Sequence, residues 1–228
     1  MAKPLHPRRS ESGRPSAVRV TLPREVDEEI RAVVRPTSQR EATSRLGRAI
    51  QLLERGDPGG AAAEAQKAKD VAPRSASVRE VLGMALYGQE RWREALAEFK
   101  VYRRISGRSD QNHVMADCLR GLGRAADAVP LVEEELKAKV SNEAKAEAVI
   151  VGASALADQG RFAEALAFLG RARTREDVSE PYTLRIWYAK GDILARAGRE
   201  EEAATEFRKI MRHDSAAFDA AERLAELG

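Results

Sequence analysis

The sequence has one cysteine, few aromatic side chains and no long apolar run, and each shortage excludes a class of protein. Cys118 has no second cysteine to pair with, so no disulfide can form within the chain, which fits a reducing cytoplasm. Aromatic residues make up only 5% of the 228 residues, which disfavours a β-sandwich. No stretch approaches the ~20 apolar residues of a membrane span, and the N-terminus lacks the apolar run of a signal peptide. We therefore expect a cytoplasmic protein that does not enter a membrane.

A clear excess of one charge sign is also missing. The chain carries 39 basic and 36 acidic residues, for a net charge of +3, which argues against a dedicated nucleic-acid-binding protein. The excess is concentrated in residues 1–22, which hold Lys3, Arg8, Arg9, Arg14 and Arg19 against Glu11. Arginine far outnumbers lysine, which is typical of a GC-rich genome, so we expect a bacterial and specifically actinobacterial source.

The sequence motifs of common enzyme classes are absent. There is no phosphate-binding loop, dinucleotide-binding glycine motif, zinc-protease motif, serine-hydrolase motif or cysteine pair. His6, His113 and His213 lie far apart, and although His113 and Asp117 share a helix face, such a pair is more often a structural contact than a catalytic dyad. Cys118 lies in an apolar stripe and is predicted to be a small buried side chain. We therefore expect no catalytic residue, cofactor or metal, and hence no enzyme.

Helical periodicity runs from residue 23 to the end of the chain. Residues 1–22 are rich in Pro, Arg and Ser and have no such period, so we expect a disordered basic tail. Pro23 begins a short amphipathic helix with an acidic first turn, which Pro36 is expected to end. Ser38 and Glu41 then predict a capping box at the start of the next helix. From residue 37 onward, apolar spacings of three and four predict helix, turn and helix in repetition.

A short turn-plus-helix phrase recurs five times. It begins with glycine, or with Glu90 in the second copy, and closes on an alanine five residues later: Ala61, Ala95, Ala128, Ala165 and Ala203. Glycine is predicted where the first helix ends in a left-handed residue, and alanine where the second helix crosses the first. Four residues further on comes Ala65, Phe99, Val132, Leu169 or Phe207. These alanines are 34, 33, 37 and 38 residues apart, close to the 34-residue period of one known repeat.

The pattern resembles the tetratricopeptide repeat (TPR), whose two helices read W-x2-L-G-x2-Y and A-x3-F, followed by proline. The last copy matches most fully, with Trp187, Gly191, Leu194, Gly198, Ala203 and Phe207. The resemblance covers about residues 42–215 and implies an all-α, TPR-type α-solenoid of about five helix hairpins. It implies an array over 37–228, an N-terminal capping helix over 23–36 and a C-terminal solvating helix over 216–227. Wider spacing around 173–183 predicts an enlarged loop.

In TPR arrays the first helices of successive hairpins line a concave groove, which the resemblance implies binds a protein or peptide partner. The implied groove residues are Glu80, Met84, Tyr87, His113, Asp117, Arg120, Arg185, Tyr188, Asp192 and Arg196, with Glu147, Ile150 and Ser154 between them. This mixed polar surface with two tyrosines suits an extended or helical peptide. In the first hairpin the same positions hold Leu46, Ile50 and Leu53, which we expect helix 24–35 to cover through Ile30, Val33 and Val34.

Three functions are consistent with this sequence. The leading one is a non-catalytic, cytoplasmic protein–protein interaction scaffold with no cofactor. The second is an RNA- or ribosome-associated accessory factor that uses the basic N-terminal tail as an electrostatic arm, whose binding would fall steeply with salt. The third is a helical-repeat enzyme that would lose turnover on substitution of His113 or Asp117. The sequence leaves the identity of the partner and the oligomeric state open.

Overall fold

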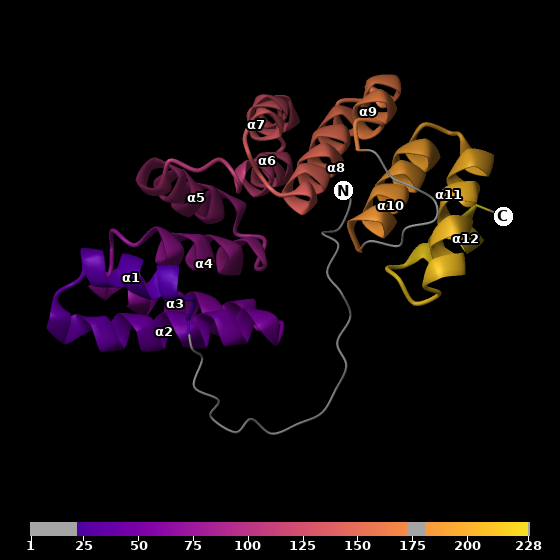
Figure 1. Cartoon of the computed structure of the whole chain (residues 1–228). Helices are drawn as coiled ribbons and strands as arrows, with labels where there is room; N and C mark the ends of the chain where they lie inside the picture. The colour runs from indigo at the N-terminus through magenta and orange to yellow at the C-terminus, as the bar shows by residue number, and fades with distance from the viewer. Residues whose placement is uncertain (1–21, 173–180, 228) are drawn as a thin grey trace. The chain divides into compact units, whose positions relative to one another are not determined.

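The computed structural model describes residues 22–172 and 181–227, which form twelve α-helices and no strand (Figure 1). These residues fall into two compact units, the N-terminal unit (22–122) and the C-terminal unit (123–227), which we describe separately. The predicted all-helical repeat fold is confirmed. Residues 1–21, the predicted basic tail, and residues 173–180 of the predicted enlarged loop lie outside the described residues.

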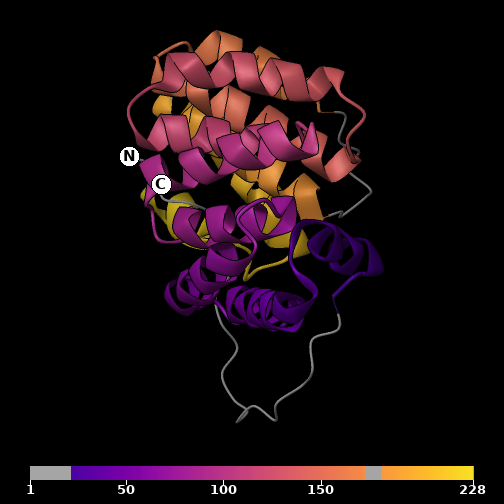
Figure 2. The same ribbon diagram turned by 90° about the vertical axis from the view of Figure 1, so that its left-hand side faces the viewer.

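The N-terminal unit consists of two helix hairpins and two further helices (Figures 1 and 2). Its second and third helices form one hairpin, the fourth and fifth form the next, and the hairpins stack in chain order through α3 against α4 and α2 against α4. The first helix lies against α2 and α4, and the sixth packs on α5. The helices are α1 (Arg24–Val33), α2 (Pro36–Glu54), α3 (Pro58–Val71), α4 (Ala76–Tyr87), α5 (Trp92–Ser106) and α6 (Asn112–Gly121).

The C-terminal unit repeats this arrangement. Helices α8 and α9 form one hairpin and α10 and α11 the next, with α10 packed on both helices of the hairpin before it. Helix α7 packs on α8 at one end, and α12 packs on α11 at the other. The helices are α7 (Ala125–Lys137), α8 (Asn142–Asp158), α9 (Phe162–Leu169), α10 (Pro181–Arg196), α11 (Glu200–His213) and α12 (Ala220–Glu226).

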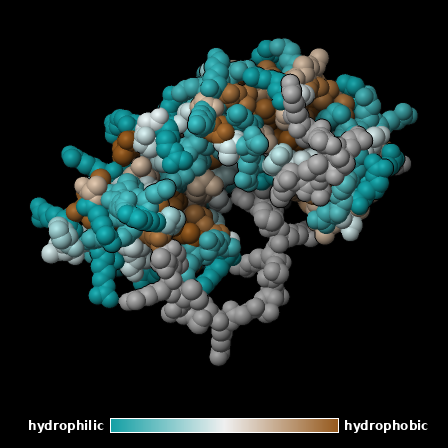
Figure 3. Space-filling model, viewed as in Figure 1, coloured by the Kyte–Doolittle hydropathy of each residue, from teal (hydrophilic) through white to brown (hydrophobic). Residues whose placement is uncertain are grey.

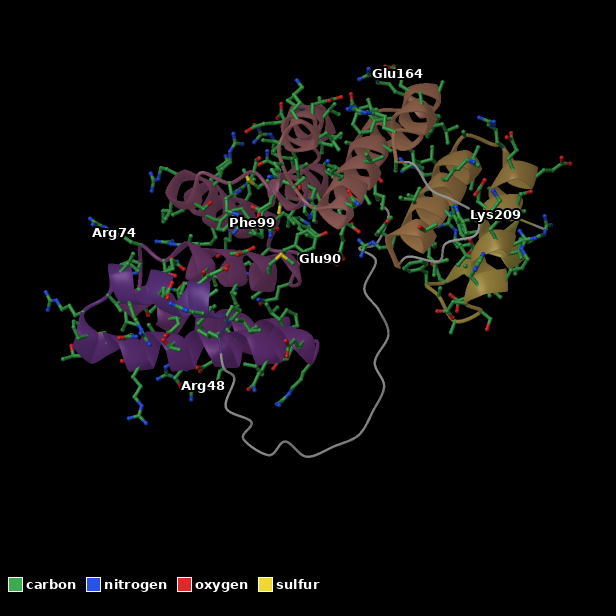
Figure 4. All side chains as sticks on the ribbon, in the orientation of Figure 1. Arg48, Arg74, Glu90, Phe99, Glu164 and Lys209 are labelled. Carbon is green, nitrogen blue, oxygen red and sulfur yellow. The ribbon has the colours of Figure 1, made fainter. Side chains whose placement is uncertain are left out.

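The predicted left-handed turns are present at all five copies of the repeated phrase. Gly56, Gly123, Gly160 and Gly198 have φ between +70° and +73°, a region that a side chain makes costly. Glu90 takes the same position between α4 and α5 with φ +59° (Figure 4). In four of the turns the next residue donates its N–H to a leucine carbonyl five residues back, at 2.8–3.0 Å. The repeated sequence phrase therefore marks the same left-handed end of the first helix in each hairpin.

The predicted crossings between paired helices are also confirmed for the four hairpins that lie within one unit, α2 with α3, α4 with α5, α8 with α9 and α10 with α11. All five alanines that close the repeated phrase are fully buried at 0% exposure. Three of the crossings bring a phenylalanine ring onto a glycine of the partner helix: Phe99 (Figure 4) onto Gly83, Phe168 onto Gly152 and Phe207 onto Gly191. A Cβ on any of these glycines would lie 2.5–2.9 Å from the ring, closer than carbon atoms pack. Glycine is therefore needed for this approach of the two helices.

Three predicted helix boundaries are wrong. Helix α1 ends at Val33 and Pro36 begins α2, because proline's missing N–H and fixed φ suit the first helical position. The N-cap of α2 is Arg35, so the predicted capping box of Ser38 and Glu41 does not form. The predicted final helix 216–227 begins only at Ala220, after Phe218 with φ +56°.

Helix α1 covers the apolar face of α2, as expected. Ile30 is fully buried against a cluster that contains Leu46, with Val34 and Ile50 packed at its margin. Leu22, which the predicted tail included, is 7% exposed and belongs to the same cluster. The Glu29 carboxylate accepts hydrogen bonds from the backbone N–H of Ala76 at 2.6 Å and of Ser77 at 3.2 Å, at the start of α4. A carboxylate there is favoured by the helix dipole, so α1 is anchored at two points.

Hydrophilic side chains cover much of the surface in the space-filling view, with apolar atoms showing between them (Figure 3). The core beneath this surface is built largely from alanine, leucine and valine. Because these side chains are small, the helices must pack closely to fill the interior.

Candidate partner-binding face

Three of the predicted groove residues in the N-terminal unit form one hydrogen-bonded group between α4 and α6. The Tyr87 hydroxyl donates to Asp117 Oδ2 at 2.5 Å, and Arg120 Nη1 donates to Asp117 Oδ1 at 2.5 Å. The Tyr87 ring also meets Trp92 edge-on, with ring centroids 5.2 Å apart. Burial and the Asp117 charge raise the pKa of Tyr87 far above its usual range, so this hydroxyl stays a donor. All three residues are partly exposed.

A second polar link joins the same two helices at their other end. Gln111, the N-cap of α6, donates its side-chain N–H to Glu80 Oε1 at 2.7 Å. Burial raises the pKa of Glu80, although the hydrogen bond from Gln111 opposes this shift. Glu80 and Gln111 are 31 residues apart, and Tyr87 and Asp117 are 30 apart, close to the repeat length. The two links thus connect neighbouring first helices of the array.

The remaining predicted residues of this face, Met84 on α4 and His113 on α6, are both partly buried. In the sequence of α4, Met84 lies between Glu80 and Tyr87, so it places an apolar side chain between the two polar links. Cys118 is fully buried, and burial raises the pKa of its thiol to about 12, which confirms the prediction of a small core side chain. We name the side chains of Glu80, Met84, Tyr87, His113, Asp117 and Arg120 the α4–α6 face.

In the C-terminal unit, two predicted arginines on α10 are bound to acids on α8. Arg185 Nη2 lies 2.7 Å from Glu147 Oε2, and Arg196 Nη2 lies 3.0 Å from Asp158 Oδ1. Both pairs are 38 residues apart, the same as the spacing of the fourth and fifth repeated alanines. Equivalent positions in consecutive hairpins therefore meet, and opposite charges there join one first helix to the next.

The other two predicted residues of α10 face the C-terminal segment. Tyr188 is only 9% exposed, donates its hydroxyl to Asp219 Oδ1 at 2.6 Å and packs against the rings of Phe207 and Phe218. Asp192 Oδ1 lies 3.0 Å from Arg223 Nη2 of α12. The end of the chain thus covers much of the predicted surface on α10, a contact that the repeat pattern did not indicate.

The described residues contain no group of three or more His, Cys, Asp or Glu side chains that could hold a metal ion. Within the same residues, no helix combines the length and the apolar character needed to cross a membrane.

Comparison with known proteins agrees with the geometry. A family model described as tetratricopeptide repeat matches residues 46–110 and 150–220. A search of curated protein sequences finds no match. Among solved structures, TTC0263, a thermophilic TPR protein of Thermus thermophilus, has 18% identity and a TM-score of 0.66, covering 82% of this chain and 98% of its own. YrrB, described as a TPR protein with an unusual peptide-binding site, has 19% identity and a TM-score of 0.54, covering 88% of this chain and 98% of its own.

A third structure, PilW, described as a type IV pilus biogenesis factor, has 17% identity and a TM-score of 0.64, covering 82% of this chain and 90% of its own. At these identities the likeness concerns the fold. The family model, however, matches more than half of the chain. The chain therefore belongs to the tetratricopeptide repeat family.

Proposed function

We propose that this protein is a non-catalytic scaffold that binds a peptide segment of a protein partner on the α4–α6 face. A tetratricopeptide array generally mediates protein–protein contact, and its extended concave surface is the usual place for it. One structurally similar protein, YrrB, is described as having a peptide-binding site. The proposal extends that kind of use to this chain.

The observation that carries the proposal is the fixed polar group of Tyr87, Asp117 and Arg120 on a partly exposed surface. A side chain that is already held in place loses less conformational freedom when a partner binds, so its contacts contribute more to affinity. Tyrosine adds contact area at low entropic cost, and Met84 adds an adaptable apolar contact. This combination suits a peptide with an apolar side chain near a polar group.

At both ends of the array, other parts of the chain cover the positions that correspond to the α4–α6 face. On α2 the corresponding apolar positions Leu46 and Ile50 are packed by α1. On α10, Tyr188 and Asp192 are engaged by the segment that contains Asp219 and Arg223. The α4–α6 face is therefore the part of the predicted surface that we propose as the main contact.

The experiment compares partner capture by matched variants. Met84→Arg places a long cation in the middle of the face, whereas Ala167→Arg adds the same charge at an exposed position on α9. In extracts of the source organism, we expect the natural chain and Ala167→Arg to capture the same partner proteins. Met84→Arg should capture about tenfold less of these proteins, or less still. A peptide from such a protein should then bind the purified chain with the same order of affinities. Identical capture by all three chains would reject the α4–α6 face as the binding site.

A further inference from the structure

The outer face of α5 carries a row of positive charges. Arg93, Ala97, Lys100 and Arg104 follow one another at intervals of four, three and four residues. Residues at these intervals lie on one face of an α-helix, and all four are exposed. We name these four residues the α5 stripe. It spans about 16 Å, at 1.5 Å per residue.

The three cations of the α5 stripe differ from most arginines of the N-terminal unit. Elsewhere in the unit an arginine commonly has an acidic partner, as Arg79 has Glu98 at 2.7 Å and Arg91 has Glu94 at 2.6 Å. Arg93, Lys100 and Arg104 make no ion pair and no side-chain hydrogen bond with any residue in the described part of the chain. Their charges are therefore available to a partner.

The fold of the unit does not account for this arrangement. Arg93 lies in the first turn of α5, where the helix dipole disfavours a cation. Lys100 and Arg104 are four residues apart, and like charges at that spacing repel each other. The dipole favours Arg104 alone, in the last turn. The helix would thus gain stability from other residues at two of these three positions.

Apolar side chains border the α5 stripe. Ile105 is 40% exposed, and it is the one exposed large apolar side chain in the residues that the structure describes. Val101, one turn before it on the same flank, is partly exposed. Ala97 is small and lies in the middle of the stripe, so a partner backbone can approach there. The surface offers three cations beside an apolar edge.

We propose that the α5 stripe docks an acidic amphipathic helix of a protein partner. Carboxylates at positions i, i+7 and i+11 of such a helix share one face and match the spacing of Arg93, Lys100 and Arg104. A small residue at i+4 would lie over Ala97, and an adjacent apolar residue would cover Ile105. A phosphate backbone would leave that apolar edge unused. The N-terminal unit also has only 18 basic residues against 15 acidic ones, which is not the strong excess of a nucleic-acid-binding surface. This site is separate from the α4–α6 face, because it lies on a second helix of a hairpin.

The test uses a fluorescently labelled synthetic peptide helix with glutamate at positions i, i+7 and i+11, alanine at i+4 and leucine on one flank. Binding to the full chain is followed by anisotropy at low salt. Charge reversal by Arg93→Glu, Lys100→Glu and Arg104→Glu together should weaken binding about tenfold or more. The matched control is Arg40→Glu, Arg208→Glu and Arg212→Glu, three exposed arginines on α2 and α11, which changes the net charge equally and should change binding about twofold or less.

Three further measurements decide the proposal. A scrambled peptide of the same composition should bind weakly, and Ile105→Ala should reduce binding by the helical peptide. Equal losses in the two triple variants, or equal binding of the scrambled peptide, would reduce the stripe to non-specific charge attraction and overturn the proposal. So would a single-stranded RNA oligonucleotide that binds at the stripe while the peptide does not. Met84→Arg should leave the peptide bound, which keeps this test independent of the α4–α6 face.

Discussion

The first and last helices of the described chain cover similar apolar faces but are held by different chemistry. Helix α1 buries Ile30 and places the Glu29 carboxylate on the backbone N–H groups that begin α4. At the other end, α12 and the turn before it are held by side chains, through Tyr188 with Asp219 and Arg223 with Asp192. A stack of hairpins always ends in an apolar face that must be covered. The need to cover the apolar face therefore determines where a capping helix lies, but it does not determine which polar contacts hold that helix in place.

The largest effect should come from removing the apolar contact on which the C-terminal cap rests. Phe207 is fully buried, its ring lies 5.7 Å from that of Tyr188, and Arg223 lies 5.4 Å above it. Phe207→Ala is expected to lower the free energy of unfolding by about 3–5 kcal/mol, because it leaves a cavity under the cap. Urea unfolding followed by circular dichroism measures this loss. The exposed Ile105→Ala is the control, at ~0.5 kcal/mol or less. A loss no larger than that of the control would show that the C-terminal cap does not depend on this ring.

The anchor of the N-terminal cap should have the next largest effect. Glu29→Ala removes the carboxylate that accepts from Ala76, Ser77 and Ser75, so the start of α4 loses its main capping partner. We expect a loss of about 1–2 kcal/mol. Hydrogen exchange of the amides of residues 76–79 should rise together with this loss. Its neighbour Glu28, paired with Arg24 at an exposed site, is the control, and Glu28→Ala should change stability by less than ~0.5 kcal/mol. Equal effects would contradict the anchor.

The repeated parts of the fold could be predicted from the sequence because they depend on short-range rules. A left-handed turn favours glycine, and a close helix crossing favours alanine, so the position of each hairpin can be predicted from a segment of about twelve residues. The prediction failed at Pro36, where the same residue is compatible with the end of one helix and the first turn of the next. Residues 34 and 35 are extended there, and periodicity alone does not place such a break.

The candidate site was predicted less completely. The resemblance to the tetratricopeptide repeat placed Tyr87, Asp117 and Arg120 in one groove, and the structure brings them together. It did not reveal that Asp219, 31 residues after Tyr188, would accept a hydrogen bond from the hydroxyl of that tyrosine. Such a contact depends on how the chain returns after α11, through Phe218 with φ +56°. No local spacing rule specifies that return.

The polar contact of the C-terminal cap should contribute less than the anchor of the N-terminal one. Tyr188→Phe removes the hydroxyl that donates to Asp219 and keeps the ring between Phe207 and Phe218. We expect a loss of about 1 kcal/mol, the usual net value of one hydrogen bond. Because burial and Asp219 raise the pKa of Tyr188, the neutral hydroxyl persists through the neutral range, so the loss should not vary between pH 6 and about 8. Tyr182→Phe, earlier on α10, is the control. A loss larger than that for Glu29→Ala would reverse the order of the two anchors.

The smallest effect should be a gain, at a turn far from either cap in sequence. Glu90 is the one copy of the repeated turn without glycine, and its φ of +59° is costly for a residue with a Cβ. Glu90→Gly should raise the free energy of unfolding by about 0.5–1 kcal/mol, since the strain relieved exceeds the entropy that glycine adds to the unfolded chain. Gly198→Ala, at the matching turn of the last hairpin, should cost a similar amount. If Glu90→Gly instead destabilises, the Glu90 side chain has a role in the second hairpin that the other turns lack. The caps would then not be the only places where the hairpins of this array differ in what holds them.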